Sequence, residues 1–420
     1  MYNTTKILDG SISLCGDKSL SHRFLFILSL IKAKSKIKNI SNSKDVFTSI
    51  DCLKKCNIDI NIKENDVLIN GGTLKDPAAE LDCRNSGSTL RMIMGLLFGQ
   101  SISASFIGDK SLSKRPMNRV ITPLQNMGAD FISNDGKLPI QMKSELIKPI
   151  IYLEKTKSAQ VKTALIFAGL GLNQWSEIAY NKNTRNHTEQ IMTDIGFDID
   201  IATKIKVKKI NLSKGIDVVI PGDISSASFI IAAAILIPGS SVTVENVLYN
   251  QNRFTYIDVL INMGAKIKIE NISNRINGVQ FCNIIANYSS NLNGISINED
   301  QIIAMIDEIP IFCIIASFAR GASIIKNAKE LKFKESNRLL SIYENLSRMK
   351  ADITLIDDTI TIVGQNKLYN TSIIHNNDHR IAMSFEIMKL AIGNDMTYKY
   401  TDIIDISFPE FYKTMDSLIS

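Results

Sequence analysis

The stretch KSLSHRFLFILSLI, residues 18–31, decides the fold, because it is the first of six stretches of one kind. It opens on small and polar residues and continues as a helix that is apolar on all sides, and such a helix has to be buried. Its counterparts are GSTLRMIMGLLFG from 87, KSAQVKTALIFAGL from 157, ISSASFIIAAAIL from 224, DEIPIFCIIASFA from 307 and DHRIAMSFEIMKL from 378. The regular spacing predicts six repeats of about 70 residues.

Each apolar stretch is followed by a run with strand-like alternation: SKIKNIS, SISASFIG, WSEIAY, SVTVENV, ASIIKNAK and MTYKYTD. An amphipathic helix comes next, and its end is marked by a residue suited to a helix C-cap, namely Gly128, Gly196, Gly264, Asn57 or Lys350. The last copy, SFPEFYKTMDSL, lacks a final strand. We expect the N-terminal strand, residues 6–14, to supply it.

These repeats predict an α/β protein in which the apolar helices pack inside, with strands and amphipathic helices outside them. Three repeats closing on themselves form a lobe. We therefore expect two lobes, one from residues 17–219 and the other from residues 1–16 plus 220–420. The alternative is a one-dimensional solenoid of the same repeats, which the length of the repeats disfavours.

Composition excludes several classes of protein. With 45% hydrophobic and 21% charged residues among 420, the chain is neither disordered nor fibrous. Its net charge of +6 suits anionic small molecules as well as nucleic acid. The apolar runs are too short to span a membrane, and the N-terminus resembles no targeting segment, so we expect a cytoplasmic protein with no membrane partner.

Cofactor and metal motifs are absent from the sequence. Six cysteines have no CxxC spacing and are expected to be reduced thiols. His375 and His379 are four residues apart, but the residues between them indicate a loop and no other ligands complete a zinc site. Without GxxxxGK[ST] or a full GxGxxG motif, no nucleotide cofactor is expected.

The openings of the apolar helices carry an unusual set of polar residues, and the loops before the amphipathic helices add cations. Helix N-termini attract phosphate and carboxylate, and arginine binds either group with two hydrogen bonds. Any one of these residues alone is typical of an N-cap or a surface charge. Their recurrence at repeat-related positions predicts a site for a polyanion, formed by Lys18, Ser19, Arg23, Asn85, Gly87, Lys114, Arg115, Ser158, Gln160, Arg185, Ser225, Ser226, Asp307, Glu308, Lys334, Glu335, Arg338, His379 and Arg380.

Ten segments together resemble one family, the 5-enolpyruvylshikimate-3-phosphate synthases, also called 3-phosphoshikimate 1-carboxyvinyltransferases. They occur in the family's order along nearly the whole chain: GDKSLSHR (16–23), NSGSTLR (85–91), GDKSLSKRPM (108–117), KSAQVK (157–162), TRNHTE (184–189), PGDISSASF (221–229), IDEIP (306–310), KESNR (334–338), NDHRIAMSF (377–385) and SFPEF (407–411). GDKS, SAQVK and RNHTE are similar to the bacterial subgroup typified by glyphosate-tolerant enzymes.

The resemblance implies a two-lobed inside-out α/β barrel, each lobe made of three βαβαββ units, and a monomer. It also implies a transferase of the shikimate pathway, which makes chorismate for aromatic amino acid biosynthesis. Such an enzyme transfers the enolpyruvyl group of phosphoenolpyruvate to the 5-hydroxyl of shikimate 3-phosphate and releases phosphate. It uses no cofactor or metal and has only small-molecule partners, with no nucleic acid.

The resemblance also assigns residues to each substrate. Contacts to shikimate 3-phosphate are implied for Lys18, Ser19, Arg23, Ser158, Ala159, Gln160, Arg185, Asp307 and Lys334. Contacts to phosphoenolpyruvate are implied for Lys18, Gly87, Arg115, Gln160, Arg338 and Arg380. The reaction needs a base for the 5-hydroxyl and an acid for the methylene carbon. Asp307 is the candidate base, and Glu335 and Lys18 are both candidate proton carriers.

Three departures and two rivals remain. Ile406 stands where some family members carry a lysine, and Asn250-Gln-Asn-Arg253 stands where the subgroup often shows NxTR. Gly87 stands where the subgroup's best-known tolerant member has alanine, so the resemblance does not imply tolerance to glyphosate. The nearest rival is the enolpyruvyl transferase that acts on UDP-N-acetylglucosamine, which usually has a cysteine in the loop that here reads GDKSLSKRP. An RNA-binding repeat protein would need aromatic residues among these basic loops for base stacking, and they contain almost none.

Overall fold

The computed structural model describes residues 6–144, 148–153, 158–180, 184–365 and 367–420. The chain divides into two compact units. We call Cys15–Ile220 with Arg275–Val279 the amino-terminal unit, and Met1–Leu14, Pro221–Asn274 and Gln280–Ser420 the carboxyl-terminal unit. The expected helix start at Lys157 lies outside the described residues.

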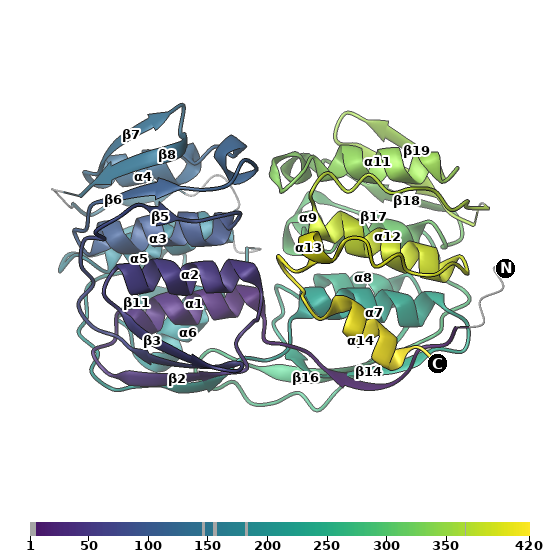
Figure 1. The fold of residues 1–420 in the computed structure, drawn as a ribbon, viewed down its shortest axis with the longest axis horizontal. Helices are drawn as coiled ribbons and strands as arrows, with labels where there is room; N and C mark the ends of the chain where they lie inside the picture. Colours follow the sequence, from purple (N-terminus) through teal and green to yellow (C-terminus); the bar gives the residue numbers. More distant parts are fainter. Residues whose placement is uncertain (1–5, 145–147, 154–157, 181–183, 366) are drawn as a thin grey trace. The chain divides into compact units, whose positions relative to one another are not determined.

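Three nearly apolar helices form the inside of the amino-terminal unit: α1 (Lys18–Ser29), α3 (Gly87–Gly99) and α5 (Ala159–Gly169). They pack on one another, and the rings of Phe26 and Phe167 meet edge to face with centroids 6.2 Å apart. Amphipathic helices accompany them, and three sheets lie outside (Figure 1). These helices are α2 (Lys44–Lys55), α4 (Asn118–Met127) and α6 (His187–Ile195), and the turn η1 (Leu112–Lys114) is a 3-10 helix.

The carboxyl-terminal unit repeats this plan around α7 (Ile224–Leu236), α10 (Ile309–Ala316) and α12 (His379–Ala391), in which every residue is buried. These three helices pack against each other and form the centre of the unit's hydrophobic core. The remaining helices are α8 (Thr255–Asn262), α9 (Glu299–Ala304), η2 (Lys329–Phe333), α11 (Arg338–Arg348), α13 (Thr401–Ile404) and α14 (Phe411–Leu418).

The described strands form five four-stranded sheets of one design, in which the first strand is parallel to the second and the other neighbours are antiparallel. In the amino-terminal unit, one sheet has the order β13 (Asp217–Val219), β2 (Lys34–Lys38), β4 (Asp66–Asn70), β3 (Asp59–Lys63). A second has the order β5 (Leu81–Asp82), β6 (Ala104–Ile107), β8 (Lys137–Lys143), β7 (Asp130–Asn134). The third has the order β9 (Ile151–Leu153), β10 (Ser176–Ala179), β12 (Ile205–Val207), β11 (Ile199–Ile201). In the carboxyl-terminal unit they are β1 (Asp9–Ser13), β14 (Ser241–Leu248), β16 (Phe281–Asn287), β15 (Lys266–Glu270); and β17 (Ser296–Ile297), β18 (Ala322–Ile325), β20 (Thr359–Val363), β19 (Asp352–Ile356). The inside-out α/β architecture predicted from the repeats is confirmed.

The strands β1 and β13 are exchanged between the two units. In three sheets the first strand directly precedes the inner helix or helices of its own repeat, as β5 precedes α3. However, β1 precedes α1 and pairs with β14, whereas β13 precedes α7 and pairs with β2. Each unit therefore receives its first strand from the segment that leads into the other unit.

The sixth repeat departs from the sequence prediction. Residues 396–402, MTYKYTD, were expected to form a strand, but Thr401 begins α13 and Tyr398 has a positive φ of 54°. Glu386 accepts hydrogen bonds from both the backbone nitrogen and the hydroxyl of Thr397, at 2.6 and 2.8 Å. The backbone nitrogen of Thr397 therefore bonds to a side chain of α12, which leaves it unavailable to a neighbouring strand. The expectation that residues 6–14 complete this repeat is also wrong, since β1 joins the fourth sheet and Leu8 makes only a bridge to Ile419.

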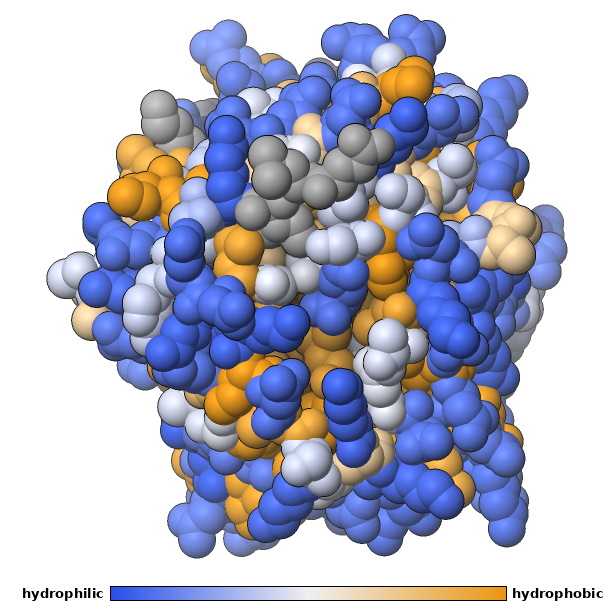
Figure 2. All heavy atoms as spheres, turned by 90° about the vertical axis from the view of Figure 1, so that its left-hand side faces the viewer, coloured by the Kyte–Doolittle hydropathy of each residue, from blue (hydrophilic) through white to orange (hydrophobic). Residues whose placement is uncertain are grey.

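Figure 2 shows a face on which hydrophilic side chains predominate and hydrophobic ones form small patches between them. In the part of the chain that the structure describes, no helix has the length and apolar character needed to cross a membrane. All six cysteines are free thiols, as expected, and five of them are buried.

Candidate active site

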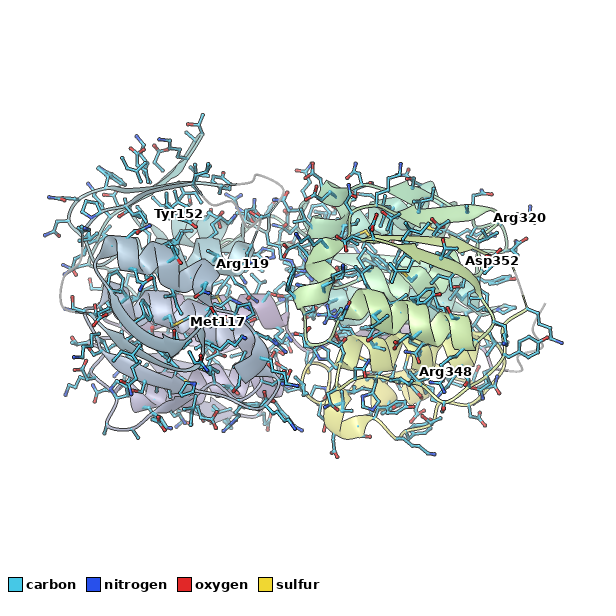
Figure 3. All side chains as sticks on the ribbon, turned by 90° about the horizontal axis from the view of Figure 1, so that it is seen from above. Met117, Arg119, Tyr152, Arg320, Arg348 and Asp352 are labelled. Atoms are coloured by element: carbon cyan, nitrogen blue, oxygen red, sulfur yellow. The ribbon has the colours of Figure 1, made fainter. Side chains whose placement is uncertain are left out.

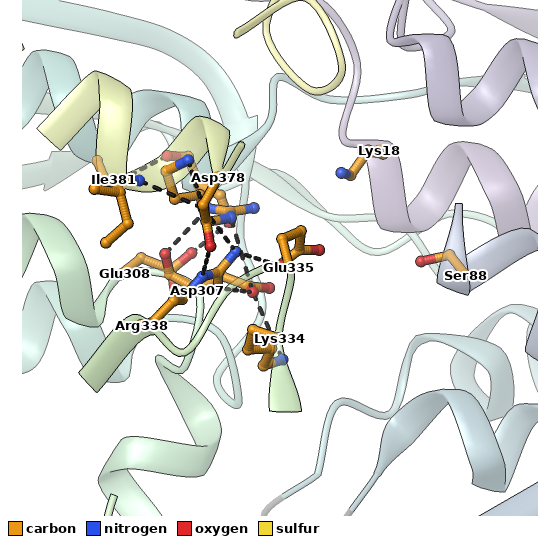
Figure 4. Close-up of polar contacts among 12 residues, drawn as sticks. Lys18, Ser88, Asp307, Glu308, Lys334, Glu335, Arg338, Asp378 and Ile381 are labelled. Atoms are coloured by element: carbon orange, nitrogen blue, oxygen red, sulfur yellow. Dashed lines mark hydrogen bonds and ion pairs between the residues drawn. The ribbon is translucent and has the colours of Figure 1, made fainter. Parts of the chain in front are cut away.

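In the carboxyl-terminal unit, a single carboxylate lies among three cations (Figure 4). Asp307 precedes α10, and its Oδ1 lies 3.3 Å from Nη1 of Arg338, 3.8 Å from Nε of Arg380 and 3.9 Å from Nζ of Lys334. The backbone oxygen of Asp307 also accepts a hydrogen bond from Nη1 of Arg380 at 3.2 Å. The structure thus brings together four residues that the sequence placed in one site.

Besides Asp307, Arg338 binds a second carboxylate, that of Asp378. The Nε of Arg338 donates to Oδ2 of Asp378 at 2.8 Å, and both side chains are buried. Burial alone would raise the pKa of Asp378, but the positive charge of Arg338 outweighs it, so this pKa lies below its usual value. Burial alone would lower the pKa of Arg338. The negative charges of Asp378, Glu335 and Asp307 outweigh this effect and raise the pKa above its usual value. Arg338 is therefore a permanently charged and fixed cation.

Glu335 is the third carboxylate that Arg338 contacts, at 2.6 Å from Nη2. It lies between the turn η2 and the start of α11, three residues before Arg338. The side chains of Asp307 and Glu335 are 18% and 22% exposed, whereas that of Arg338 is 1% exposed. Both carboxylates are therefore open to an exchangeable proton, and the arginine that orients them is not.

In the amino-terminal unit, the first two turns of α1 carry Lys18, Ser19 and Arg23. The Nζ of Lys18 lies 3.0 Å from Oδ2 of Asp45 in the first turn of α2. Arg23 donates from Nη1 to the backbone oxygen of Ser19 at 2.9 Å, and from Nε to the hydroxyl of Thr188 on α6 at 2.9 Å. The two cations of α1 are thus held by partners on two other helices, α2 and α6.

The start of α3 is surrounded by guanidinium groups. Gly87 is the first residue of α3, and a Cβ there would lie 2.8 Å from Nη1 of Arg91 and 3.3 Å from Nη1 of Arg115. Arg115 donates from Nη2 to Oδ1 of Asn85 at 3.2 Å and to Ser111 at 3.4 Å. Because residue 87 has no side chain, two arginines can approach the first residue of α3.

The start of α5 is tied to α3 through Gln160. Its Oε1 accepts a hydrogen bond from Nη1 of Arg91 at 2.6 Å, and its Nε2 donates to the hydroxyl of Ser88 at 2.8 Å. Ser158 caps α5 by accepting from the nitrogen of Val161 at 3.4 Å. Ala159, the first residue of α5, adds no polar group beyond its backbone.

Arg185 lies two residues before α6 and is half-buried. Thr188 in the first turn of α6 shares a hydrogen bond of 2.7 Å with Thr163 of α5 and accepts from Arg23 of α1. The beginnings of α1, α5 and α6 are therefore joined by polar contacts in the amino-terminal unit.

The helix α1 also carries a buried histidine. His22 is 1% exposed, and its Nδ1 shares a hydrogen bond of 2.8 Å with Ser49, which in turn contacts Thr89 at 2.8 Å. Burial, and secondarily the positive charges of Lys18 and Arg23, hold the pKa of His22 well below its ordinary value. His22 is therefore a neutral connector between α1, α2 and α3.

Several residues that organise these clusters were missed by the sequence reasoning. The sequence pattern does not single out Asp45, Ser88 or Arg91 as site residues, and it marks Asp378 only as the opening of an apolar helix. Asp378 had a usable signal, since an aspartate just before an apolar helix is a preferred N-cap, and it accepts from the nitrogens of Arg380 and Ile381. Arg91 lies one helical turn after Gly87. The partnership of Lys18 with Asp45 had no local signal, because it depends on the packing of α1 against α2.

In the amino-terminal unit, the helix starts carry guanidinium groups that other side chains hold in place. In the carboxyl-terminal unit, Arg338 contacts two partly exposed carboxylates, those of Asp307 and Glu335. Guanidinium groups suit anions, and carboxylates can move protons. Within the described residues, no group of three His, Cys, Asp or Glu side chains is arranged to hold a metal ion.

This fold is shared with the enolpyruvyl transferases. The enolpyruvyl transferase NikO from Streptomyces tendae superimposes with a TM-score of 0.75 over 100% of this chain and 97% of its own, and its 12% identity speaks for the fold alone. EPSP synthase from Acinetobacter baumannii superimposes with a TM-score of 0.85 and 30% identity, covering 100% of this chain and 98% of that chain.

Sequence comparison narrows the class to one family. The 3-phosphoshikimate 1-carboxyvinyltransferase of Caldicellulosiruptor bescii is 39% identical, covering 98% of this chain and 96% of its own length. That of Oceanobacillus iheyensis is also 39% identical, covering 98% and 97%. The sequence model of EPSP synthase (3-phosphoshikimate 1-carboxyvinyltransferase) matches residues 2–415. The chain belongs to this family, as its sequence motifs predicted.

Proposed function

We propose that Asp307, Glu335 and Lys18 are the catalytic residues of this chain. As a member of its family, the chain transfers the enolpyruvyl group of phosphoenolpyruvate to the 5-hydroxyl of shikimate 3-phosphate, and phosphate is released. The observation that carries the assignment is Asp307, a partly exposed carboxylate within 3.3 to 3.9 Å of three cations.

Asp307 serves as the base for the 5-hydroxyl. Its side chain is partly exposed and its Oδ1 lies beside three cations, so this oxygen is placed to accept a proton from a bound hydroxyl. A second group has to deliver a proton to the methylene carbon of phosphoenolpyruvate. Glu335 and Lys18 remain the two candidates, since one is a partly exposed carboxylate on Arg338 and the other a partly exposed ammonium on Asp45.

The substrate contacts follow the motifs residue by residue. Shikimate 3-phosphate contacts Lys18, Ser19, Arg23, Ser158, Ala159, Gln160, Arg185, Asp307 and Lys334. Phosphoenolpyruvate contacts Lys18, Gly87, Arg115, Gln160, Arg338 and Arg380. The cations suit the phosphate and carboxylate groups of these two substrates, and the helix starts at Gly87 and Ala159 add backbone N–H donors.

One assay tests the reaction and its nearest rival together. Release of phosphate from phosphoenolpyruvate is measured with shikimate 3-phosphate and, separately, with UDP-N-acetylglucosamine as the acceptor. We expect release only with shikimate 3-phosphate. Release only with UDP-N-acetylglucosamine would overturn the assignment, and the loop 108–116, which has no cysteine, already argues against it.

We also propose that the chain belongs to the bacterial subgroup typified by glyphosate-tolerant enzymes, and that it works as a cytoplasmic monomer. The motifs GDKS, SAQVK and RNHTE support the subgroup. The best-known tolerant member of the subgroup has alanine where this chain has Gly87, so membership of the subgroup does not predict tolerance to glyphosate. Light scattering with size exclusion tests the monomer.

A further inference from the structure

Next to Asp307 in the sequence is a second carboxylate with different partners. The side chain of Glu308 is 1% exposed and accepts a short hydrogen bond from the hydroxyl of Ser225. Arg253, also 1% exposed, donates from Nη2 to the same hydroxyl at 2.7 Å and lies 3.7 Å from Oε1 of Glu308. We call Arg253, Ser225 and Glu308 the Arg253 cluster.

The Arg253 cluster joins three separate elements of the carboxyl-terminal unit. Ser225 is in the first turn of α7, and its nitrogen donates to Asp223, the N-cap, at 2.7 Å. Arg253 comes from the loop between β14 and α8, where its nitrogen donates to the oxygen of Asn250 at 2.8 Å. Glu308 is the N-cap of α10. The loop that carries Arg253 and the first turn of α7 thus hold the start of α10.

The position of the Glu308 side chain depends on the Arg253 cluster. Its Oε2 is buried and makes no hydrogen bond within the described part of the chain, so Oε1 carries the contacts of the carboxylate. The side chain of Glu308 does not bond to the first turn of α10 either. Removal of Arg253 would leave a buried carboxylate with a hydroxyl partner and no cation near it, which is an unfavourable state.

The two adjacent carboxylates have separate cations. Asp307 faces Arg338, Arg380 and Lys334, and Glu308 faces Arg253. Without Arg253, the carboxylate of Glu308 would be held by the hydroxyl of Ser225 alone. Because Asp307 is the preceding residue and its backbone oxygen is bonded to Arg380, a displacement of Glu308 also disturbs Asp307.

We propose that Arg253 is a positioning residue for the reaction. Through Ser225 and Glu308 it fixes the first turn of α10, so that Asp307 points towards its three cations and Glu308 does not compete for them. This inference rests on the role of Asp307 given under the proposed function. It also gives a reason for an arginine at residue 253, which the sequence alone left unexplained.

The test compares Arg253→Met with a control of the same kind elsewhere in the unit. Lys389 and Glu386 on α12 form another buried pair, 3.0 Å apart, with side chains 3% and 0% exposed. Lys389→Met therefore also leaves a carboxylate without its lysine partner, but at the C-terminal end of α12. Arg348→Met on α11 is the surface control, since Arg348 is exposed and bonds to Ser372 at 3.0 Å (Figure 3).

For each variant, kcat and both KM values are measured well below the melting temperature, and calorimetry with shikimate 3-phosphate counts the folded sites. We expect Arg253→Met to lower kcat per folded site by about tenfold or more, because small displacements of a catalytic group are costly, with both KM values within about threefold. Arg253→Lys, which keeps the charge, and Arg253→Met/Glu308→Gln, which leaves no unpaired carboxylate, should both recover part of the loss. Lys389→Met should lower the melting temperature and leave kcat unchanged.

Wild-type kcat per folded site in Arg253→Met, whatever its melting temperature, would overturn the inference and leave Arg253 with a role in stability alone. If Arg253→Met does not fold, Glu308→Gln replaces it, and wild-type kcat per folded site in that variant would be equally decisive. A wild-type protein that releases no phosphate with shikimate 3-phosphate would instead contradict the proposed function, so the two failures are distinguishable.

Discussion

The buried neutral His22 predicts a specific dependence of stability on pH. In the folded chain its pKa lies well below the ordinary value near 6.5, because the ring is buried and Lys18 and Arg23 are close. In the unfolded chain the same ring takes up a proton as the pH falls through about 6.5. The unfolded state then binds more protons than the folded state, so the contribution of His22 to stability is complete above about pH 6.5 and is lost as the pH falls towards the folded pKa.

The size of the loss follows from the difference between the two states. With an unfolded pKa of about 6.5 and a folded pKa far below it, lowering the pH from 7.5 to 5.5 removes about 1.4 kcal/mol from the free energy of unfolding. For a unit of this size, that corresponds to a fall in melting temperature of about 3 to 5 °C.

The comparison is with His22→Asn, which does not titrate and keeps a polar group that can face Ser49. Unfolding in urea is followed by the fluorescence of Trp175, the only tryptophan, which lies in the same unit as His22. We expect the wild-type protein to lose about 1.4 kcal/mol more than the variant between pH 7.5 and 5.5. The pKa of His375 is also lowered by burial, but His375→Asn should leave the signal of Trp175 unaffected because His375 belongs to the other unit.

An equal pH dependence in the wild type and His22→Asn would refute the reasoning. It would mean that the folded protein accepts a proton on His22 next to Lys18 and Arg23 without loss of stability. The hydrogen bond to Ser49 would then have to be made by a charged ring.

Three further predictions concern the reaction. Asp307→Asn should keep the fold and the binding of shikimate 3-phosphate but lower kcat by about 10²-fold or more, the scale of a general base; near wild-type turnover would exclude Asp307 as the base. Arg380→Ala should weaken phosphoenolpyruvate by about 1.5–3 kcal/mol and shikimate 3-phosphate by less, and equal losses in calorimetry would show that the subsites are wrongly assigned. Gly87→Ala places a Cβ 2.8 Å from Arg91 and 3.3 Å from Arg115. Its KM for phosphoenolpyruvate should rise by about tenfold, and an unchanged KM would mean that both guanidinium groups yield freely.

Much of the fold could be predicted because its signals are local. Apolar helices with no polar face had to be buried, and α7, α10 and α12 are buried at every residue. The ends of the amphipathic helices were equally clear, since Gly128 and Gly196 have φ angles of 114° and 92°, and even Lys350 adopts a φ of 66° at the same place.

The failures lie where distant residues decide the conformation. The sixth strand was expected from the alternation in MTYKYTD, but the carboxylate of Glu386, on α12, binds Thr397 and prevents it. In the same way, motif reasoning found Arg338 but not the buried Asp378 that holds it, and found Lys18 but not Asp45. The partner of a charged residue is set by helix packing, which spacing along the chain does not reveal.

The exchange of β1 and β13 has a consequence for synthesis. As the chain leaves the ribosome, the amino-terminal unit obtains its last strand when Asp217–Val219 emerge, so its three sheets can close while most of the other unit is still unmade. In contrast, β1 is made first and has to wait for Ser241–Leu248 before it can pair. A waiting strand is a hazard for the nascent chain, because its free edge can pair with another molecule. The segment DGSIS has four exposed positions out of five and a single large apolar residue, Ile12, so it can wait in water without inviting aggregation.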